Sequence, residues 1–267
     1  MAIYICLGDL HGQVATLERL RAVQARYPEA ITVFIGDYID CYGENSGFEL
    51  IEQIRAMQQA DPRHVVVLMG NHEQAAVDFF DDEWRDAWLR FGGRNTLTTA
   101  GISVGGNQDV RMNRQLLLER KAALIDWMRA LPLTYAAEKL FCVHAGLDLM
   151  LENSITDTPE YDRLWLRAKY WYSRSLSWGT FGHNPLDVSL ITGHTPNGMI
   201  AGEYDEQQRP AKLESNHHPI YAIQYPNEMP RYLMDGGAGS GDVHLLGNIG
   251  VFDGETGLLI DKVEDKV

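Results

Sequence analysis

Side chains of the types that bind metals follow three apolar runs of the chain, at the point where each run ends. The three endings are Gly8-Asp9-Leu10-His11-Gly12, Gly36-Asp37-Tyr38-Ile39-Asp40 and Gly70-Asn71-His72-Glu73. Two later runs end similarly, in His144-Ala145-Gly146 and Gly193-His194-Thr195. Carboxylate, amide and imidazole groups without a thiolate suit Mn²⁺, Fe or Zn²⁺. Two such ions held close together bind phosphate oxygens, turn a water between them into hydroxide and stabilise an in-line displacement. The set therefore predicts hydrolysis of a phosphate ester.

Each of these residues, taken alone, has an ordinary structural explanation. An isolated Asp after a strand, such as Asp9 or Asp37, is usually a helix cap. An isolated His, such as His144 or His194, is more often hydrogen-bonded within the protein than bound to a metal. The coincidence of five strand ends that carry such groups next to glycine is what favours a metal site.

The elements that must position these motifs are indicated by apolar runs rich in β-branched residues. Strands buried on both faces are predicted over 3–7, 31–35, 65–69 and 140–143. Helical spacing over 14–26 and 48–59 separates the first three strands, which predicts parallel βαβ units. Because the carboxyl ends of such strands meet at one edge of the sheet, the motifs are expected to converge there.

The remainder of the chain is expected to flank and complete this core. Helices are predicted over 84–91, 111–130 and 161–172. A second, partly antiparallel sheet is predicted from short runs at 188–192, 219–223, 232–234, 243–246 and 257–260. The segment 253–257 reads as a hairpin turn and 203–218 as a loop. With no linker between the parts, we expect a single domain over 1–267.

Composition and charge exclude several classes of protein. The 267 residues carry 37 acidic and 23 basic side chains, a formal charge of −14, so non-specific binding of nucleic acid is not expected. No apolar run reaches the roughly 20 residues that span a bilayer. The N-terminal residues show no basic segment before an apolar run, as a signal peptide would, so we expect a cytoplasmic location. We also expect no membrane partner.

The ordered motifs GDLHG, GDYID, GNHE, HAG and GHT resemble those of the calcineurin-like metallophosphoesterases. The resemblance is specifically to the phosphoprotein phosphatase branch, which includes eukaryotic Ser/Thr phosphatases and the phage lambda phosphatase. It runs from Gly8 to Thr195, and Asp235-Gly236-Gly237 extends it. The resemblance implies an α/β fold of the α+β kind, a two-sheet αββα sandwich with a dinuclear metal site at the carboxyl ends of its strands.

The resemblance also implies a role for each motif residue. Asp9 and His11 would bind one metal ion, and Asp37 would bridge both ions. The second ion would be completed by Asn71, His144 and His194. The cofactor would be two divalent ions, with Mn²⁺ preferred over Fe or Zn²⁺. His72 would be the general acid that protonates the leaving oxygen, and Asp40 would orient it, because a carboxylate behind an imidazole fixes its tautomer and stabilises its protonated form.

The phosphate clamp is where the chain departs from the family pattern. An arginine commonly follows the second Asp of GDxxD, but Cys41 stands here. A second family arginine, in a Trp-x-Arg stretch, is matched by Trp165-Leu166-Arg167, so Arg167 is the predicted substrate-binding residue. Arg94 is a further candidate to replace the missing group. The thiol of Cys41 is interpreted as a neutral replacement, with a redox-sensitive group or a marker of altered substrate choice as alternatives.

The branch leaves the substrate open between a phosphoprotein and a nucleotide. Asp40 favours the pattern of the protein phosphatases, because bacterial-type diadenosine tetraphosphatases often lack that Asp. Our first expectation is a phosphomonoesterase similar to the Ser/Thr phosphatases, and the alternative is a dinucleoside polyphosphate hydrolase. A non-catalytic metal-binding regulatory module is a second alternative, motivated by the missing clamp and opposed by the intact His72, Asp40 and six predicted metal ligands.

Overall fold

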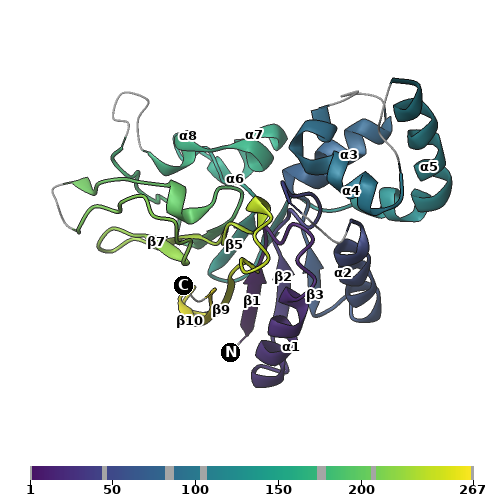
Figure 1. Cartoon of the computed structure of the whole chain (residues 1–267). Helices are drawn as coiled ribbons and strands as arrows, with labels where there is room; N and C mark the ends of the chain where they lie inside the picture. The colour runs from purple at the N-terminus through teal and green to yellow at the C-terminus, as the bar shows by residue number, and fades with distance from the viewer. Residues whose placement is uncertain are drawn as a thin grey trace.

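The computed structural model of the chain contains two five-stranded sheets and helices outside them (Figure 1). It describes residues 2–43, 47–81, 87–102, 107–172, 179–205 and 209–265. The first sheet has the strand order β10-β9-β1-β2-β3, and its strands are β1 (Ile3–Leu7), β2 (Ile31–Phe34), β3 (Val65–Val67), β9 (Ile249–Asp253) and β10 (Leu259–Val263). The second has the order β4-β5-β6-β8-β7, with β4 (Thr134–Ala136), β5 (Leu140–Val143), β6 (Ser189–Thr192), β7 (Tyr221–Ile223) and β8 (Arg231–Leu233).

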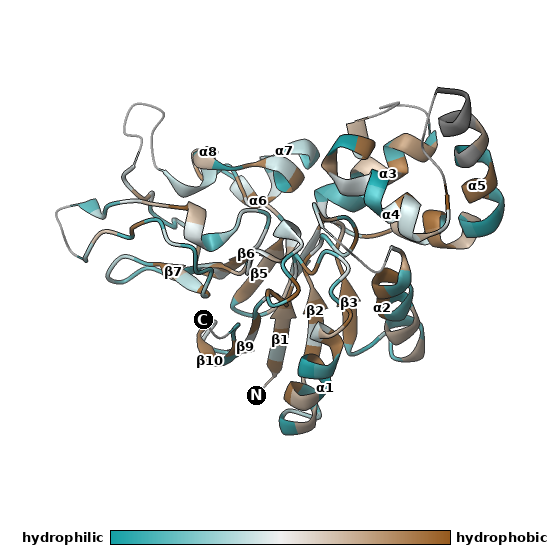
Figure 2. Ribbon diagram, in the orientation of Figure 1, coloured by the Kyte–Doolittle hydropathy of each residue, from teal (hydrophilic) through white to brown (hydrophobic). Residues whose placement is uncertain are grey.

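The two sheets pack face to face because their strands alternate between two apolar layers. Cys6 of β1 lies in the layer between the sheets, with Cys142 of β5 and Ile191 of β6. The neighbouring Ile5 and Leu7 point to the opposite face, where helices cover the first sheet. Figure 2 shows these strands as hydrophobic through most of their length. The expected two-sheet αββα arrangement is confirmed.

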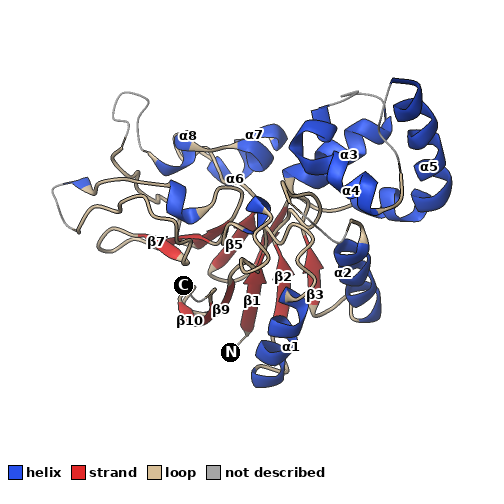
Figure 3. Ribbon diagram, viewed as in Figure 1, coloured by secondary structure: helices blue, strands red, loops and turns tan. Residues whose placement is uncertain are grey.

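Two groups of helices cover the outer faces of the sheets (Figure 3). The first sheet is covered by α1 (Thr16–Arg26) and α2 (Glu49–Ala60), whose buried Leu20 and Ile54 join its apolar layer. Beyond the end of this sheet lie α3 (Asn71–Asp81), the π-helical turn η1 (Leu89–Gly93), α4 (Arg94–Thr99) and α5 (Asn107–Arg129). The second sheet carries α6 (Ser154–Asp157), α7 (Glu160–Trp165) and α8 (Ala168–Trp171).

The parallel core matches the expectation closely. β1 pairs in parallel with β2, and β2 with β3, with α1 and α2 as the crossover helices. β5, β6 and β8 are parallel in the second sheet. The turn at 253–257 forms as expected, because the Gly257 N–H donates to the Asp253 carbonyl at 2.8 Å. Over 203–218 the described residues form no α-helix and no strand of the two sheets, and 206–208 lie outside the described part.

Three expectations about the elements are wrong. The sequence pattern predicts the run 257–260 in the second sheet, but β10 pairs with β9, which pairs antiparallel with β1 and so extends the first sheet. Residues 243–246 form turns and irregular backbone rather than a strand. The helix over 161–172 is interrupted at Arg167, whose φ of −128° and ψ of −110° are not helical.

Other boundaries differ in detail. β3 ends at Val67, two residues before the expected end, and α3 begins directly at Asn71, within the motif that follows this strand. Of the helix expected over 84–91, residues 84–86 lie outside the described residues, and the rest leads into η1. The helices of the described residues include none that is both long and apolar enough to span a membrane.

Candidate dinuclear metal centre

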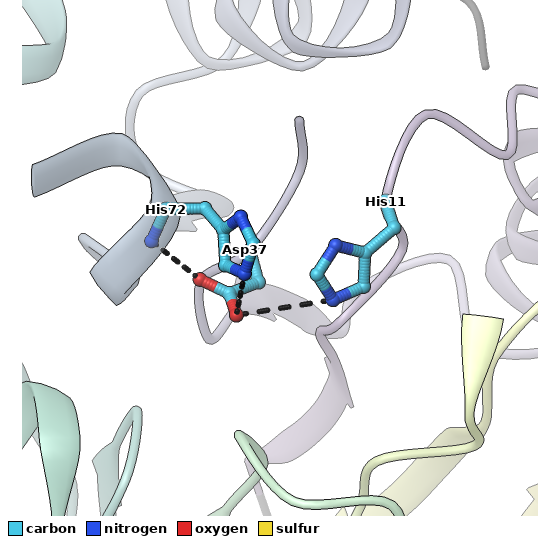
Figure 4. Close-up of side chains that lie close together, drawn as sticks. All are labelled: His11, Asp37 and His72. Carbon is cyan, nitrogen blue, oxygen red and sulfur yellow. Dashed lines mark hydrogen bonds and ion pairs between the residues drawn. The ribbon is translucent and has the colours of Figure 1, made fainter. Parts of the chain in front are cut away.

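The strand-end motifs of both sheets meet at the carboxylate of Asp37. The carboxyl ends of β1, β2 and β3 point toward the region where α3 and α7 face each other (Figure 1). Asp37 Oδ2 lies 3.8 Å from His11 Nε2, 3.8 Å from His72 Nε2 and 3.4 Å from His144 Nε2. Figure 4 shows the rings of His11 and His72 next to this carboxylate, with the interactions as dashed lines. The carboxylate of Asp37, in the loop after β2, therefore faces imidazoles from the loop after β1, from α3 and from the residue that follows β5.

Two groups of potential metal ligands share Asp37. One group is His11, Asp37 and His72, and the other is Asp37, His144 and His194. Within each group the ligand atoms lie within 4.8 Å of one another. Such a shared carboxylate is the geometry expected of a residue that bridges two ions.

The histidines are held with a lone pair toward the centre. His11 Nδ1–H donates to the carbonyls of Ile39 (3.1 Å) and Asp40 (2.7 Å), and His144 Nδ1–H donates to that of Ile35 (2.9 Å). Because carbonyl oxygens only accept, Nε2 of each ring is left to face Asp37.

The amide oxygen of Asn71 belongs to the same cluster. Asn71 Oδ1 lies 2.9 Å from His144 Nε2 and 2.8 Å from His194 Nδ1. With the Asp37 carboxylate close by, several lone-pair atoms converge on one small buried volume. Such a cluster requires either added protons or a cation, and the donor types suit a divalent metal ion.

Asp9 and His194 supply two buried atoms without a hydrogen-bond partner. Asp9 Oδ1 accepts the backbone N–H of His194 at 2.6 Å, whereas Asp9 Oδ2 and His194 Nε2 have no partner among the described residues. Burial and the charges of Asp235 and Asp37 raise the pKa of Asp9 well above its usual range. Burial also raises the pKa of Asp235 to about 7. This buried excess of negative charge fits positive metal ions.

The backbone of the site is held in an unusual conformation. A positive φ occurs at five of its residues, Asp9 (54°), His11 (44°), Asp37 (59°), Asp40 (66°) and His194 (70°). Asn227 is the only other non-glycine residue with a positive φ in the described part of the chain. Such strain concentrates at functional sites, where the surrounding structure fixes it.

Glu73 fixes two of the motif loops to each other. Its buried carboxylate accepts backbone N–H groups from Asp37 (2.9 Å), Tyr38 (2.8 Å), Ile39 (3.3 Å) and Gly70 (3.1 Å). All four partners are donors. The loop after β2 and the turn before α3 are therefore positioned by one side chain.

His72 and Asp40 form a hydrogen-bonded pair next to the metal ligands. His72 Nδ1 lies 3.0 Å from Asp40 Oδ2, and the His72 backbone N–H donates to Asp37 Oδ1 at 3.0 Å. Burial acts to lower the pKa of His72, but the charges of Asp37 and Asp40 outweigh it and raise this pKa to about 9. His72 is thus equipped to carry a proton at neutral pH.

The predicted arginines differ in their placement. Arg167 donates to the hydroxyl of Thr195 and to the His194 carbonyl at 3.2 Å, which puts its guanidinium beside a predicted metal ligand. Arg94 is exposed at the first residue of α4, and its role stays a prediction. The Cys41 thiol is buried and donates to the carbonyl of Gly43 at 3.1 Å. It is therefore turned toward its own loop.

The structure adds residues to which the sequence assigned no role. Trp88 and Thr96 both donate to Asp40, from positions 48 and 56 residues away in the chain. Glu73 and Asp235 stand within the sequence motifs, so the sequence indicated that they lie near the site. It did not indicate which groups they contact. The geometry brings all eight predicted metal and acid–base residues to one place, whereas their individual roles remain proposals.

Comparison with known proteins identifies the class to which this fold and site belong. The sequence pattern described as "Calcineurin-like phosphoesterase" matches residues 4–224. The chain therefore belongs to the calcineurin-like phosphoesterase family, and the protein is a metallophosphoesterase, an enzyme that hydrolyses phosphoesters with a dinuclear metal centre.

Among the solved structures that the chain resembles, one is similar enough to support this assignment at the level of the fold. One described as a "putative diadenosine tetraphosphatase" has a TM-score of 0.55 and 18% identity, and the match covers 98% of this chain and 92% of that chain. A metallophosphoesterase from Sphaerobacter thermophilus has a TM-score of 0.47 and 14% identity, with 99% and 89% covered. A serine/threonine phosphatase from Saccharomyces cerevisiae has a TM-score of 0.36 and 13% identity, with 73% and 61% covered. Only the first score is high enough to indicate a shared fold.

Proposed function

We propose that the protein hydrolyses phosphate monoesters of the phosphoserine and phosphothreonine type with two Mn²⁺ ions. In this proposal Asp9 and His11 hold one ion, Asn71, His144 and His194 hold the other, and Asp37 is shared. When bound, the ions would supply positive charge around the phosphate and an activated water. We further propose a phosphorylated protein as the partner and the cytoplasm as the place of action.

The observation that carries the proposal is the contact of His72 with Asp40. Asp40 holds His72 Nδ1–H, so that Nε2 is directed toward the ligand atoms, 3.8 Å from Asp37 Oδ2. A serine or threonine alkoxide is a poor leaving group and needs a proton as the bond to phosphorus breaks. In our proposal His72 donates that proton, and Asp40 fixes the imidazole and stabilises its protonated form before the transfer. Arg167, beside His194, binds a phosphate oxygen.

A second candidate, hydrolysis of dinucleoside polyphosphates, is favoured by a row of aromatic rings beside His72. The ring of Phe91 lies 6.5 Å from that of His72 and 5.6 Å from that of Trp165, between centroids. Tyr161 stacks on Trp165 at 6.0 Å and is largely exposed. Planar bases stack on such surfaces. The solved structure described as a tetraphosphatase has the same substrate class, but its likeness to this chain concerns the fold.

The experiment compares turnover of a phosphothreonine peptide and of diadenosine tetraphosphate by the Mn²⁺-loaded protein. Preference for the peptide, lost in His72→Ala, is the expected result. The second candidate would replace the first if the protein prefers the dinucleotide and if Tyr161→Ala raises the KM for the dinucleotide but not for the peptide. Turnover of the peptide by His72→Ala at the wild-type rate would contradict the assignment of the acid.

A further inference from the structure

Asp40 is a buried carboxylate whose two oxygens both accept hydrogen bonds from the helical stretch 87–99. Trp88 Nε1–H donates to Asp40 Oδ2 at 2.6 Å, the oxygen that also contacts His72 Nδ1. The hydroxyl of Thr96 donates to Asp40 Oδ1 at 2.5 Å. Trp88, Thr96 and Asp40 are all fully buried. The carboxylate that orients the proposed acid is therefore itself oriented by two neutral donors.

The same stretch grips the loop that follows Asp40. Gly92 has a φ of +101°, and a Cβ at this position would lie 2.9 Å from the backbone N and O of Cys41. Asn95 Nδ2 donates to the carbonyls of Cys41 (3.0 Å) and Gly43 (3.2 Å). Only a glycine permits this close approach with this backbone conformation. The contacts lie at the loop where Cys41 replaces the family arginine.

The buried indole of Trp88 packs against two aromatic rings. Its ring centroid lies 5.2 Å from that of Phe79 and 5.7 Å from that of Phe80, both on α3. α3 also carries His72 at its first turn. Asp40 is thus fixed by a donor that is packed on the helix that presents the imidazole. A carboxylate held by two donors on rigid elements has a fixed orientation toward the imidazole that it contacts.

We propose that Trp88 and Thr96 are positioning residues for the reaction, which fix Asp40 so that His72 Nε2 points at the leaving oxygen. The inference rests on the proposed role of His72 as the general acid. If Trp88 and Thr96 only satisfied buried polar atoms, their loss would affect folding and would act equally on all substrates. If they position the acid, their loss acts mainly on substrates whose leaving group needs a proton.

The test compares two phosphate monoesters with Mn²⁺-loaded protein: a phosphothreonine peptide, whose alkoxide needs protonation, and p-nitrophenyl phosphate, whose phenolate does not. Thr96→Val removes the hydroxyl with little change of shape, and Thr96→Ser keeps it. Trp88→Phe removes the indole N–H. The matched control is Thr98→Val, which removes an exposed hydroxyl from the same helix, where it donates to the Arg94 carbonyl at 2.8 Å. Urea unfolding and bound Mn²⁺ are measured for every variant.

For Thr96→Val we expect kcat on the peptide to fall by about 10- to 100-fold. This factor corresponds to the free energy that one hydrogen bond to a charged group usually contributes. KM on the peptide and kcat on p-nitrophenyl phosphate should remain close to wild type. Thr96→Ser should restore kcat, and Thr98→Val should resemble the wild type. Trp88→Phe should show the same selective loss wherever it retains Mn²⁺ and a cooperative unfolding transition.

Equal losses on both esters, or none, would overturn the positioning role of Trp88 and Thr96. His72→Ala separates this failure from a failure of the proposed function. If His72→Ala selectively loses activity on the peptide while Thr96→Val does not, only the positioning inference is wrong. If His72→Ala loses activity equally on both esters, His72 is not the acid, and both proposals are wrong.

Discussion

Glu73 offers the sharpest test of how the site is held together. Its carboxylate accepts four backbone N–H groups from the two loops that carry Asp37 and Asn71. Glu73→Gln keeps the shape of the side chain but replaces one oxygen by an NH₂ group. Because all four partners are donors, the new amide N–H groups would face donors, and the backbone N–H groups on that side would lose their acceptor.

The magnitude follows from the number of donors on each oxygen. Oε1 accepts from Tyr38 and Ile39, and Oε2 accepts from Asp37 and Gly70, so either orientation of the amide leaves two buried N–H groups unpaired. At about 1–3 kcal/mol for each buried unpaired group, the free energy of unfolding should fall by about 2–6 kcal/mol. Burial and the charge of Asp37 raise the pKa of Glu73 to about 7, so the full difference is expected above that pH, where the wild-type carboxylate is ionised and both of its oxygens accept.

The assay is urea unfolding of the metal-free protein, followed by titration with Mn²⁺. Glu73→Gln should be less stable by the stated amount and should bind Mn²⁺ more weakly, because Asp37 and Asn71 are no longer fixed. The control Glu52→Gln removes an exposed carboxylate that pairs with Lys121 at 2.5 Å, and it should cost less than about 1 kcal/mol. Equal stability and Mn²⁺ affinity of Glu73→Gln and wild type would show that Glu73 does not hold the two loops in place.

Three further predictions concern the surroundings of the site. Arg167→Met should raise KM for a phosphate ester by about tenfold or more without a change in urea unfolding, whereas an unchanged KM would remove Arg167 as the clamp. Gly193→Ala should reduce bound Mn²⁺, because the new Cβ would lie 1.8 Å from Asp9 Oδ2; wild-type metal content by elemental analysis would contradict this. Burial, with help from His217 and Lys212, lowers the pKa of His218, which accepts the Gly198 N–H through Nδ1 at 2.9 Å. Below about pH 6.5 His218 therefore binds a proton in the unfolded chain but not in the native protein. The free energy of unfolding should decrease as the pH is lowered through that window. His218→Asn should show a shallower fall between pH 7 and 5 in urea unfolding, and an unchanged slope would refute this origin.

The sequence predicted the centre of the molecule well because its signals are local. Asp9, Asp37 and Asn71 each stand directly after an apolar run, and parallel strands bring their carboxyl ends together whatever the details of packing. The same logic placed His144 and His194, on strands of the other sheet. The convergence of five strand ends thus follows from topology and needs no knowledge of side-chain contacts.

What the sequence did not predict depends on partners far apart in the chain. β10 belongs to the first sheet because β9 pairs with β1, from Ile3 with Asp253 to Leu7 with Ile249, and no local pattern marks that pairing. Trp88 falls in the helix predicted over 84–91 and Thr96 in a segment for which the sequence predicts no element, and neither position indicates a contact with Asp40. The break at Arg167 is equally invisible, since helical periodicity continues across it.

Titration of metal-free protein with Mn²⁺, with bound ions and turnover followed together, tests whether the metal centre is dinuclear. We predict two ions for each chain, with hydrolysis only after both are bound, and loss of both ions in Asp37→Asn because that carboxylate is shared. A single bound ion at full activity, or two ions and wild-type turnover in Asp37→Asn, would contradict a dinuclear centre built on Asp37.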